Sequence, residues 1–329
     1  MTKTRIAHAR CLTTGALFVC MIVTVLGMPR SAHAMVFNIT YDSSTVGAPA
    51  DFFTAFNYAA NFYQSAFSDP VTINVQVGWG QINGGSLAPG DLGQSETFQQ
   101  GFYNYGQMKT ALITDAKTAS DALAVANLPL SYPVGGTNFV MSNAEAKALG
   151  LLAGNATGLD GYVGFDSTAS FTFDPNNRAV SGKYDFIGLA GHEISEVMGR
   201  YGLGQNGASS GRFSPIDLFR YSSPATLDTT PANGDYFSID SGITNINTYN
   251  GTGGGDLSDW AGLTLDPYNA FLTSGKQLSE SPADMTLMDV IGWDLATPEP
   301  GTFGLVFIGV AGLTLRRSRV RASSSGPVY

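Results

Sequence analysis

Cysteine is absent from residues 35–297 of this 329-residue chain, and histidine is almost absent. Both cysteines, Cys11 and Cys20, lie in the first 34 residues, as do two of the three histidines. The central part therefore has neither a disulfide nor a thiol nucleophile. Its single imidazole, that of His192, is the one histidine available there for acid–base or metal chemistry.

Basic residues are also scarce in the central part. Eight of the 17 lysines and arginines lie in the first 34 residues or after Pro300, whereas only one of the 26 acids, Glu299, lies outside 35–297. The resulting net charge, near −16, argues against nucleic acid and anionic membranes as partners and favours solubility or divalent-cation binding. No phosphate-binding glycine loop follows a predicted strand, and a Ser-His-Asp hydrolase would have to be built around His192, so we set nucleotide binding and serine hydrolases aside.

The N-terminus has the pattern of a signal peptide. Lys3, Arg5 and Arg10 precede an apolar run over 15–27, and Ala32-His33-Ala34 follows it. A basic start, a short apolar centre and an Ala-x-Ala exit predict cleavage after Ala34 by signal peptidase. The alternative is an N-terminal membrane anchor, but the run is short for a span of about 20 residues.

The C-terminus carries a second sorting pattern over 298–322. Pro298-Glu299-Pro300 precedes an apolar stretch over 301–315 and four arginines between 316 and 321. This segment resembles the PEP-CTERM sorting signal, which implies processing by an exosortase-type peptidase and delivery to the surface of a Gram-negative cell. It predicts transient membrane association through a transmembrane-like helix. A plain C-terminal anchor is the alternative, although fifteen helical residues rise only about 22 Å.

Hydrophobic periodicity between the two ends predicts one domain over 35–297 of the α/β (α+β) class. Spacings of three and four predict helices, and alternation with β-branched residues predicts strands. The predicted helices cover 50–68, most of 97–126, 142–152, 185–198 and a segment from 281, and the predicted strands cover 71–79, 161–165, 170–173 and 236–240.

The helix over 185–198 carries the residues that point to chemistry. His192 and Glu196 are four apart and lie on one helix face, so both can reach one cation. Glu193 is near enough to contact a water bound to that cation. Because apolar residues surround much of this helix, its ionisable groups are costly to bury unless they are paired or metal-bound.

The His192-Glu193-Ile-Ser-Glu196 segment resembles the His-Glu-x-x-His helix of zincin metallopeptidases. Gly199 matches the glycine that ends this helix in metzincin-like proteases. The wider chain, with segments over 217–221, 236–240 and 255–260, resembles a family of PEP-CTERM-tagged metalloproteases. The resemblance implies a zincin-like mixed sheet, an active-site helix and a C-terminal helix. It also implies that Glu193 is the general base, that His192 and Glu196 are metal ligands, and that the substrate is a protein or peptide.

The sequence departs from the zincin pattern at the remaining ligands. The second ligand is Glu196 rather than histidine, the usual third-ligand position is Gly202, and no methionine lies between Met198 and Met285. A zinc site needs a third protein ligand. We choose Asp217, with Asp240, Asp256 and Asp259 as weaker candidates. Zinc is the expected metal, but so many oxygen donors leave manganese, iron and calcium open.

The sequence leaves two alternatives to a peptidase open. The histidine and glutamate one turn apart can form a simple ion pair, in which case the chain is a non-catalytic surface or biofilm-matrix protein with a zincin-like fold. The acid-rich segment over 235–266 could instead bind a structural calcium, although its spacing does not match an EF-hand loop.

Overall fold

A four-stranded mixed sheet supports the centre of the molecule. Strands β1 (Val36–Tyr41), β2 (Thr72–Trp79) and β6 (Gly161–Phe165) are parallel, and β3 (Gly93–Thr97) joins β6 antiparallel at one edge, giving the order β1-β2-β6-β3. This computed structural model describes residues 35–134, 138–202, 211–230, 232–251, 254–262 and 265–296. The predicted signal peptide and the sorting segment over 298–322 lie outside these residues.

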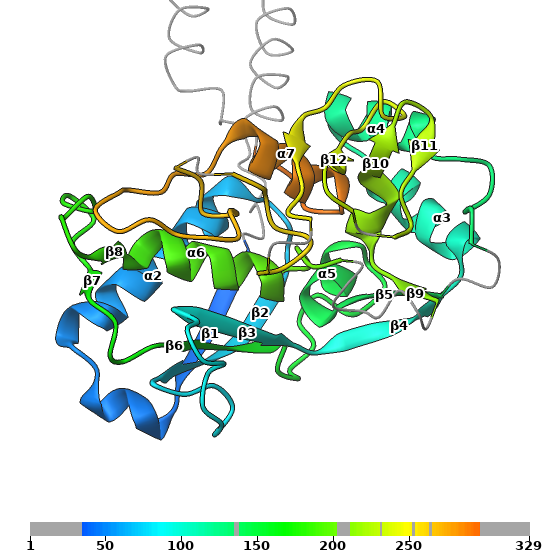
Figure 1. Cartoon of the computed structure of the whole chain (residues 1–329). Coiled ribbons are helices and arrows are strands. Elements are labelled where there is room, and N and C mark those ends of the chain that lie inside the picture. The colour runs from blue at the N-terminus through cyan, green and yellow to red at the C-terminus, as the bar shows by residue number, and fades with distance from the viewer. Residues whose placement is uncertain are drawn as a thin grey trace, which may run out of the picture.

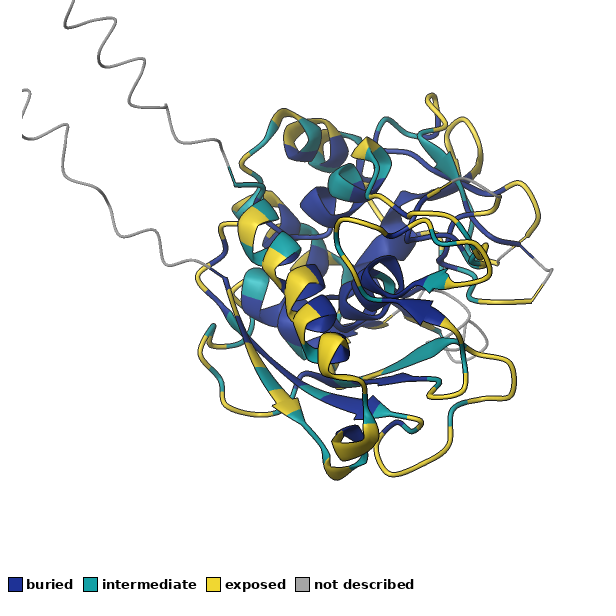
Figure 2. Cartoon of the chain, turned by 90° about the vertical axis from the view of Figure 1, so that its left-hand side faces the viewer, coloured by how far each residue is buried: buried dark blue, intermediate teal, exposed yellow. Residues whose placement is uncertain are grey.

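Helices α2 (Ala50–Ala66) and α6 (Phe186–Val197) pack on one face of this sheet (Figure 1). The helix residues that face the sheet are buried, whereas the outer side of α2 is exposed (Figure 2). Aromatic rings join the layers, with 4.8 Å between the centroids of Phe165 and Phe186. The Tyr63 hydroxyl donates to the Gly191 carbonyl oxygen at 2.9 Å, which fixes α6 against α2.

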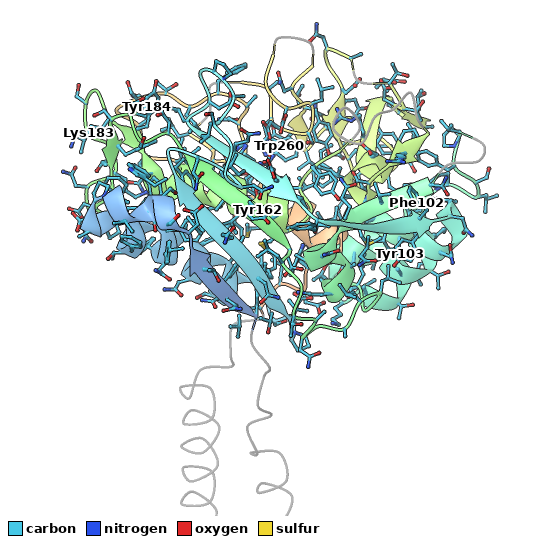
Figure 3. All side chains as sticks on the ribbon, turned by 90° about the horizontal axis from the view of Figure 1, so that it is seen from below. Phe102, Tyr103, Tyr162, Lys183, Tyr184 and Trp260 are labelled. Carbon is cyan, nitrogen blue, oxygen red and sulfur yellow. The ribbon has the colours of Figure 1, made fainter. Side chains whose placement is uncertain are left out.

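The opposite face of the sheet is more polar. Gln76 of β2 and Tyr162 of β6 are register partners on neighbouring strands, so their side chains share that face. Figure 3 shows Tyr162 there, on the side away from the two helices. The alternation of apolar residues toward the helices and polar residues away from them is what the sequence of β2 predicts.

The remaining elements are further helices, two 3-10 turns and the strands of smaller sheets. The helices are α3 (Tyr105–Asp115), α4 (Ala119–Asn127), α5 (Asn143–Ala148) and α7 (Pro282–Val290), with 3-10 turns at Ser43–Gly47 and Pro215–Phe219. A second sheet contains β4 (Gln99–Tyr103), β5 (Asn138–Ser142) and β9 (Arg212–Phe213). A third contains β11 (Thr226–Leu227), β10 (Arg220–Ser223), β12 (Tyr236–Phe237) and β13 (Asn247–Thr248), and β7 (Phe171–Thr172) pairs with β8 (Tyr184–Asp185).

The α+β class predicted from the sequence is confirmed, and α2, β2, α6 and α7 lie close to their predicted ranges. One prediction was wrong in detail, because the predicted helical stretch over 97–126 begins with strand β4. Within the described ranges, no helix is both long and apolar enough to cross a membrane.

The C-terminal end of the described chain packs against the end of α2, beside a cluster of buried acids. Ala296 donates its N–H to the Ala66 carbonyl oxygen at 2.8 Å. Next to this contact, Asp69 accepts from the Asp294 N–H at 2.9 Å, and Lys117 pairs with the Asp294 carboxylate. Burial, and then the charge of Asp294, raise the pKa of Asp69 to about 7.

This raised pKa predicts that Asp69 makes stability depend on pH. A carboxyl whose pKa is higher in the folded than in the unfolded state stabilises the fold below pH 4, and that contribution disappears as the pH rises through about 7. We expect Asp69→Asn, which cannot ionise, to raise the free energy of unfolding at pH 8 by roughly 1–3 kcal/mol. The gain should be much smaller at pH 5. Urea unfolding at both pH values measures this gain in the free energy of unfolding. Asp51→Asn, on the exposed side of α2, is the control. An equal gain from Asp69→Asn at both pH values would contradict the prediction.

Candidate metal centre

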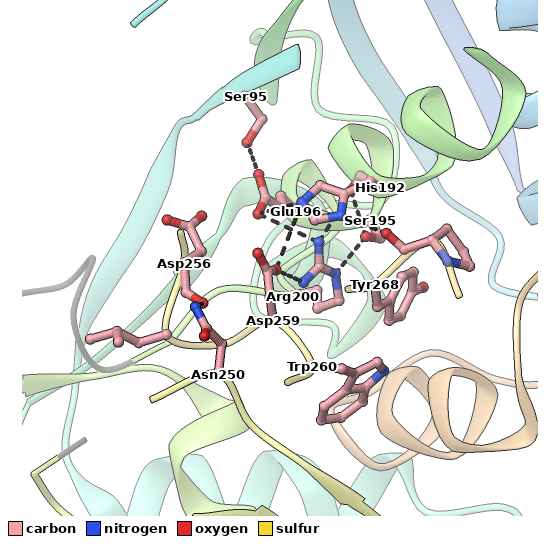
Figure 4. A network of polar contacts seen from close by, with 12 residues as sticks. Ser95, His192, Ser195, Glu196, Arg200, Asn250, Asp256, Asp259, Trp260 and Tyr268 are labelled. Atoms are coloured by element: carbon pink, nitrogen blue, oxygen red, sulfur yellow. Dashed lines mark hydrogen bonds and ion pairs between the residues drawn. The ribbon is translucent and has the colours of Figure 1, made fainter. Parts of the chain in front are cut away.

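Three side chains with metal-binding atoms converge at the C-terminal half of α6. The Nε2 atom of His192 lies 3.4 Å from Oε1 of Glu196 and 3.7 Å from Oδ1 of Asp259 (Figure 4). The three ligand atoms lie within 4.8 Å of one another. Ligands of a tetrahedral zinc, at bonds of about 2.0–2.1 Å, lie roughly 3.3 Å apart. The donor set therefore fits one divalent cation with little rearrangement.

The imidazole of His192 is oriented for this purpose. Its Nδ1 lies 2.6 Å from the carbonyl oxygen of Pro267, and a carbonyl can only accept, so Nδ1 carries a proton. The other nitrogen, Nε2, faces the two carboxylates. A histidine held by a backbone carbonyl through one nitrogen and free to coordinate through the other is the usual arrangement of metal ligands.

The same groups neutralise one another when no cation is present. Burial and the charge of Arg200 oppose protonation of His192, but Asp259 and Glu196 outweigh them and raise the pKa of His192 to about 10. Burial would raise the pKa of Glu196, yet His192 and Arg200 lower it to about 2. Without metal, the centre is thus an imidazolium–carboxylate network, and a cation must displace the proton of Nε2.

Neighbouring side chains fix the two carboxylates. Ser95, on strand β3, donates its hydroxyl to Oε2 of Glu196 at 2.7 Å. The fully buried guanidinium of Arg200 bonds Oδ1 of Asp259 and lies 3.4 Å from Oε1 of Glu196. These contacts therefore join three parts of the fold at the candidate metal centre: strand β3, helix α6 and the loop that carries Asp259.

Glu193 lies beside the centre and is not part of the ligand cluster. Its side chain is buried against β3, where a Cβ on Gly93 would lie 2.5 Å from Oε1 of Glu193. Burial, followed by the charge of Glu196, raises the pKa of Glu193 well above its ordinary value. Its position in the cleft beside the candidate ligands places this carboxyl where it could exchange a proton with a water molecule.

An open cleft gives access to these groups. One half is a polar cavity of about 380 Å³ lined by His192, Glu193 and Asp259 together with Asp256. The other half, of about 330 Å³, shares His192 and Glu193 and adds apolar side chains, among them Leu92, Leu189 and Phe271. Among the described residues that line either half there is no lysine or arginine.

The structure does not bring Asp217, our predicted third ligand, into the cluster. Asp217 is fully buried and stands at the start of the 3-10 turn Pro215–Phe219, where its Oδ2 accepts the Ser214 N–H at 2.8 Å. This hydrogen bond caps the 3-10 turn, so the Asp217 carboxylate has a local structural role. Of the weaker candidates, Asp259 supplies the third ligand atom, Asp256 lines the cleft, and Asp240 accepts from Ser238 and Thr244 in an exposed turn. We therefore replace Asp217 by Asp259.

Sequence reasoning also missed Ser95 and Gly93 as parts of the site. Both lie on β3, whose sequence Gly-Gln-Ser-Glu-Thr has no apolar alternation. Asp259 and Asp217 both lie in segments matched to the resembled family, so that resemblance did not choose between them. The indole N–H of Trp260 donates to Asp284 at 2.7 Å, which anchors the loop that carries Asp259 to α7.

Comparison with known proteins bears on the C-terminus. Residues 296–319 match the PEP-CTERM protein-sorting motif. The chain carries an exosortase sorting signal. It is thus exported, processed by an exosortase and delivered to the cell surface of a Gram-negative bacterium, as predicted from 298–322. No curated protein and no solved structure matches the chain. Nothing in these comparisons shows a zincin or metalloprotease family.

Proposed function

We propose that this exported protein is a metal-dependent peptidase that hydrolyses peptide bonds in protein or peptide substrates. The observation that carries the proposal is the convergence of His192, Glu196 and Asp259 on one point, with Glu193 beside them in the same open cleft. One nitrogen and two carboxylate donors suit zinc, and also harder divalent metals.

The roles of the side chains follow from their positions. His192, Glu196 and Asp259 would hold the cation, which when bound polarises the substrate carbonyl and activates a water molecule. Glu193 takes a proton from the attacking water and then donates it to the leaving nitrogen. Its buried position beside Gly93 fixes the carboxylate where the cleft opens to substrate.

The edge strand β3 gives the substrate a place to bind. It pairs with β6 on one side, and Gly93, Ser95 and Thr97 line the cleft on the other. An extended peptide can pair with such an edge through main-chain hydrogen bonds. Its side chains would then alternate between the polar half and the apolar half around Leu92 and Phe271. Asp91, which lines both halves, and the surplus of acids favour cationic substrates.

One observation favours a second candidate function. The network of His192, Glu196, Arg200 and Asp259 has two positive and two negative groups when the imidazole is protonated, so it is balanced without a cation. A non-catalytic surface or biofilm-matrix protein could keep this network as a packed ion-pair cluster that joins α6 to the loop of Asp259.

Metal content and activity of the purified protein over residues 35–297 separate the two functions. We expect about one equivalent of transition metal by elemental mass spectrometry and cleavage of an unfolded protein such as reduced casein. A chelator should stop the cleavage, and adding the metal back should restore it. A protein that contains no stoichiometric metal after growth with zinc, manganese or iron, and does not cleave casein, would establish the second function instead.

A further inference from the structure

Arg200 is placed unusually for an arginine, because no part of its side chain reaches solvent. It follows Gly199, whose φ of +117° ends α6, and it is completely buried. Its Nε donates to the Ser195 hydroxyl at 2.7 Å. The guanidinium also lies over the Tyr268 ring, 4.5 Å from the centroid. An arginine stays charged even in such surroundings, so a fixed positive charge lies within the protein at this position.

This charge is directed at the atoms that would bind the metal. The guanidinium contacts Oδ1 of Asp259 and Oε1 of Glu196, the same two oxygens that face Nε2 of His192. Figure 4 shows Arg200 pointing at both carboxylates from the side opposite Ser95. Arg200 therefore lies behind the ligand set and touches two of its three members.

The charge of the ligand set explains why an arginine is useful here. A neutral imidazole and two carboxylates carry −2, which fully offsets a divalent cation and weakens its ability to polarise a carbonyl. One buried positive charge in contact with both carboxylates offsets one of their charges. The cation, its three ligands and Arg200 together then keep a net charge of +1.

We propose that Arg200 is a positioning residue that sets the charge of the metal centre. Acting through Glu196 and Asp259, its charge weakens their pull on the cation, so that the bound metal remains electrophilic. The inference rests on the proposed metal centre, but not on the identity of the substrate.

The sign of a change in metal affinity tests this role. In the purified exported protein, Arg200→Gln removes the charge, and we expect the Kd for Zn²⁺, measured by competition with a chromophoric chelator, to fall about tenfold or more. We expect kcat for peptide cleavage to fall with KM little changed. If Arg200 only supports the fold, the ligands lose their orientation and zinc binds more weakly, as is usual when residues around metal ligands are changed. Weaker or unchanged zinc binding in Arg200→Gln thus overturns the proposal.

Arg200→Lys is the matched variant because it keeps the charge and loses the fork of donors. We expect its Kd for Zn²⁺ to stay within about threefold of the parent and its kcat to be partly restored relative to Arg200→Gln. If Arg200→Gln does not fold, Arg200→Lys alone tests the proposal. A loss of Zn²⁺ affinity of about tenfold or more in Arg200→Lys would then overturn the role of the charge. A parent protein that binds neither zinc nor manganese nor iron refutes the proposed function itself, which separates the two failures.

Discussion

Replacing Glu193 by glutamine is expected to lower kcat for peptide cleavage about a thousandfold or more while leaving bound metal unchanged. The amide has the size of the carboxylate but cannot accept a proton from water, and general-base catalysis typically contributes 10²–10⁴-fold. Glu193 lies outside the ligand cluster of His192, Glu196 and Asp259, so the cation should remain. Steady-state cleavage of a quenched fluorescent peptide and elemental mass spectrometry measure the two effects.

Glu96→Gln is the matched control for this substitution. Glu96 lies on the edge strand β3, against which Glu193 of α6 packs, but it is exposed and accepts from the side-chain amide of Asn83 at 2.9 Å. We expect its kcat to stay near that of the parent. If Glu193→Gln digests the peptide as fast as Glu96→Gln, then Glu193 is not the general base.

The largest effect on metal binding is expected at Asp259 and His192. Removing either donor leaves two protein ligands, fewer than a stable zinc site has. We expect Asp259→Asn and His192→Ala to lose about 100-fold or more in metal affinity, beyond the 10–100-fold typical of changes around the ligands. Chelator competition gives the affinities, and elemental mass spectrometry should find less than one equivalent in each variant.

Asp217→Asn distinguishes this assignment from the one that the sequence favoured. Its carboxylate caps the turn Pro215–Phe219 through Ser214, so its loss should cost about 1 kcal/mol of stability and leave the metal in place. Thermal unfolding and metal analysis of both aspartate variants give the comparison. Metal retained in Asp259→Asn but lost in Asp217→Asn would show that the centre described here is not the binding site.

The same substitutions also bear on the second candidate function. Asp259 and Arg200 form a buried ion pair, and removing one member of such a pair costs about 3–5 kcal/mol because the other charge is left uncompensated. Asp259→Asn is thus destabilising under either function. Metal affinity, rather than stability, is the quantity that separates a peptidase centre from a packed network.

The sequence alone determined the C-terminal sorting segment and the helix that carries the candidate ligands His192 and Glu196. The sorting segment is contiguous, and its three parts can be recognised in order without any fold. Helix α6 is equally local, because the spacing of His192, Glu193 and Glu196 fixes their relative positions on a helix at once. The apolar residues around them identify an interior helix, and α6 is almost entirely buried.

Tertiary structure decided what lies across from that helix. The third candidate ligand, Asp259, comes from a loop more than sixty residues away. Nothing in local spacing distinguishes Asp259 from Asp217, since both are acids beside apolar segments. Their roles differ only because one carboxylate faces Nε2 of His192 while the other accepts from Ser214. The sequence did not predict the edge strand β3, for a related reason. Its residues form a strand because they pair with β6, and they belong to the candidate site because they lie against α6. Both are long-range contacts that a polar five-residue sequence does not encode by itself.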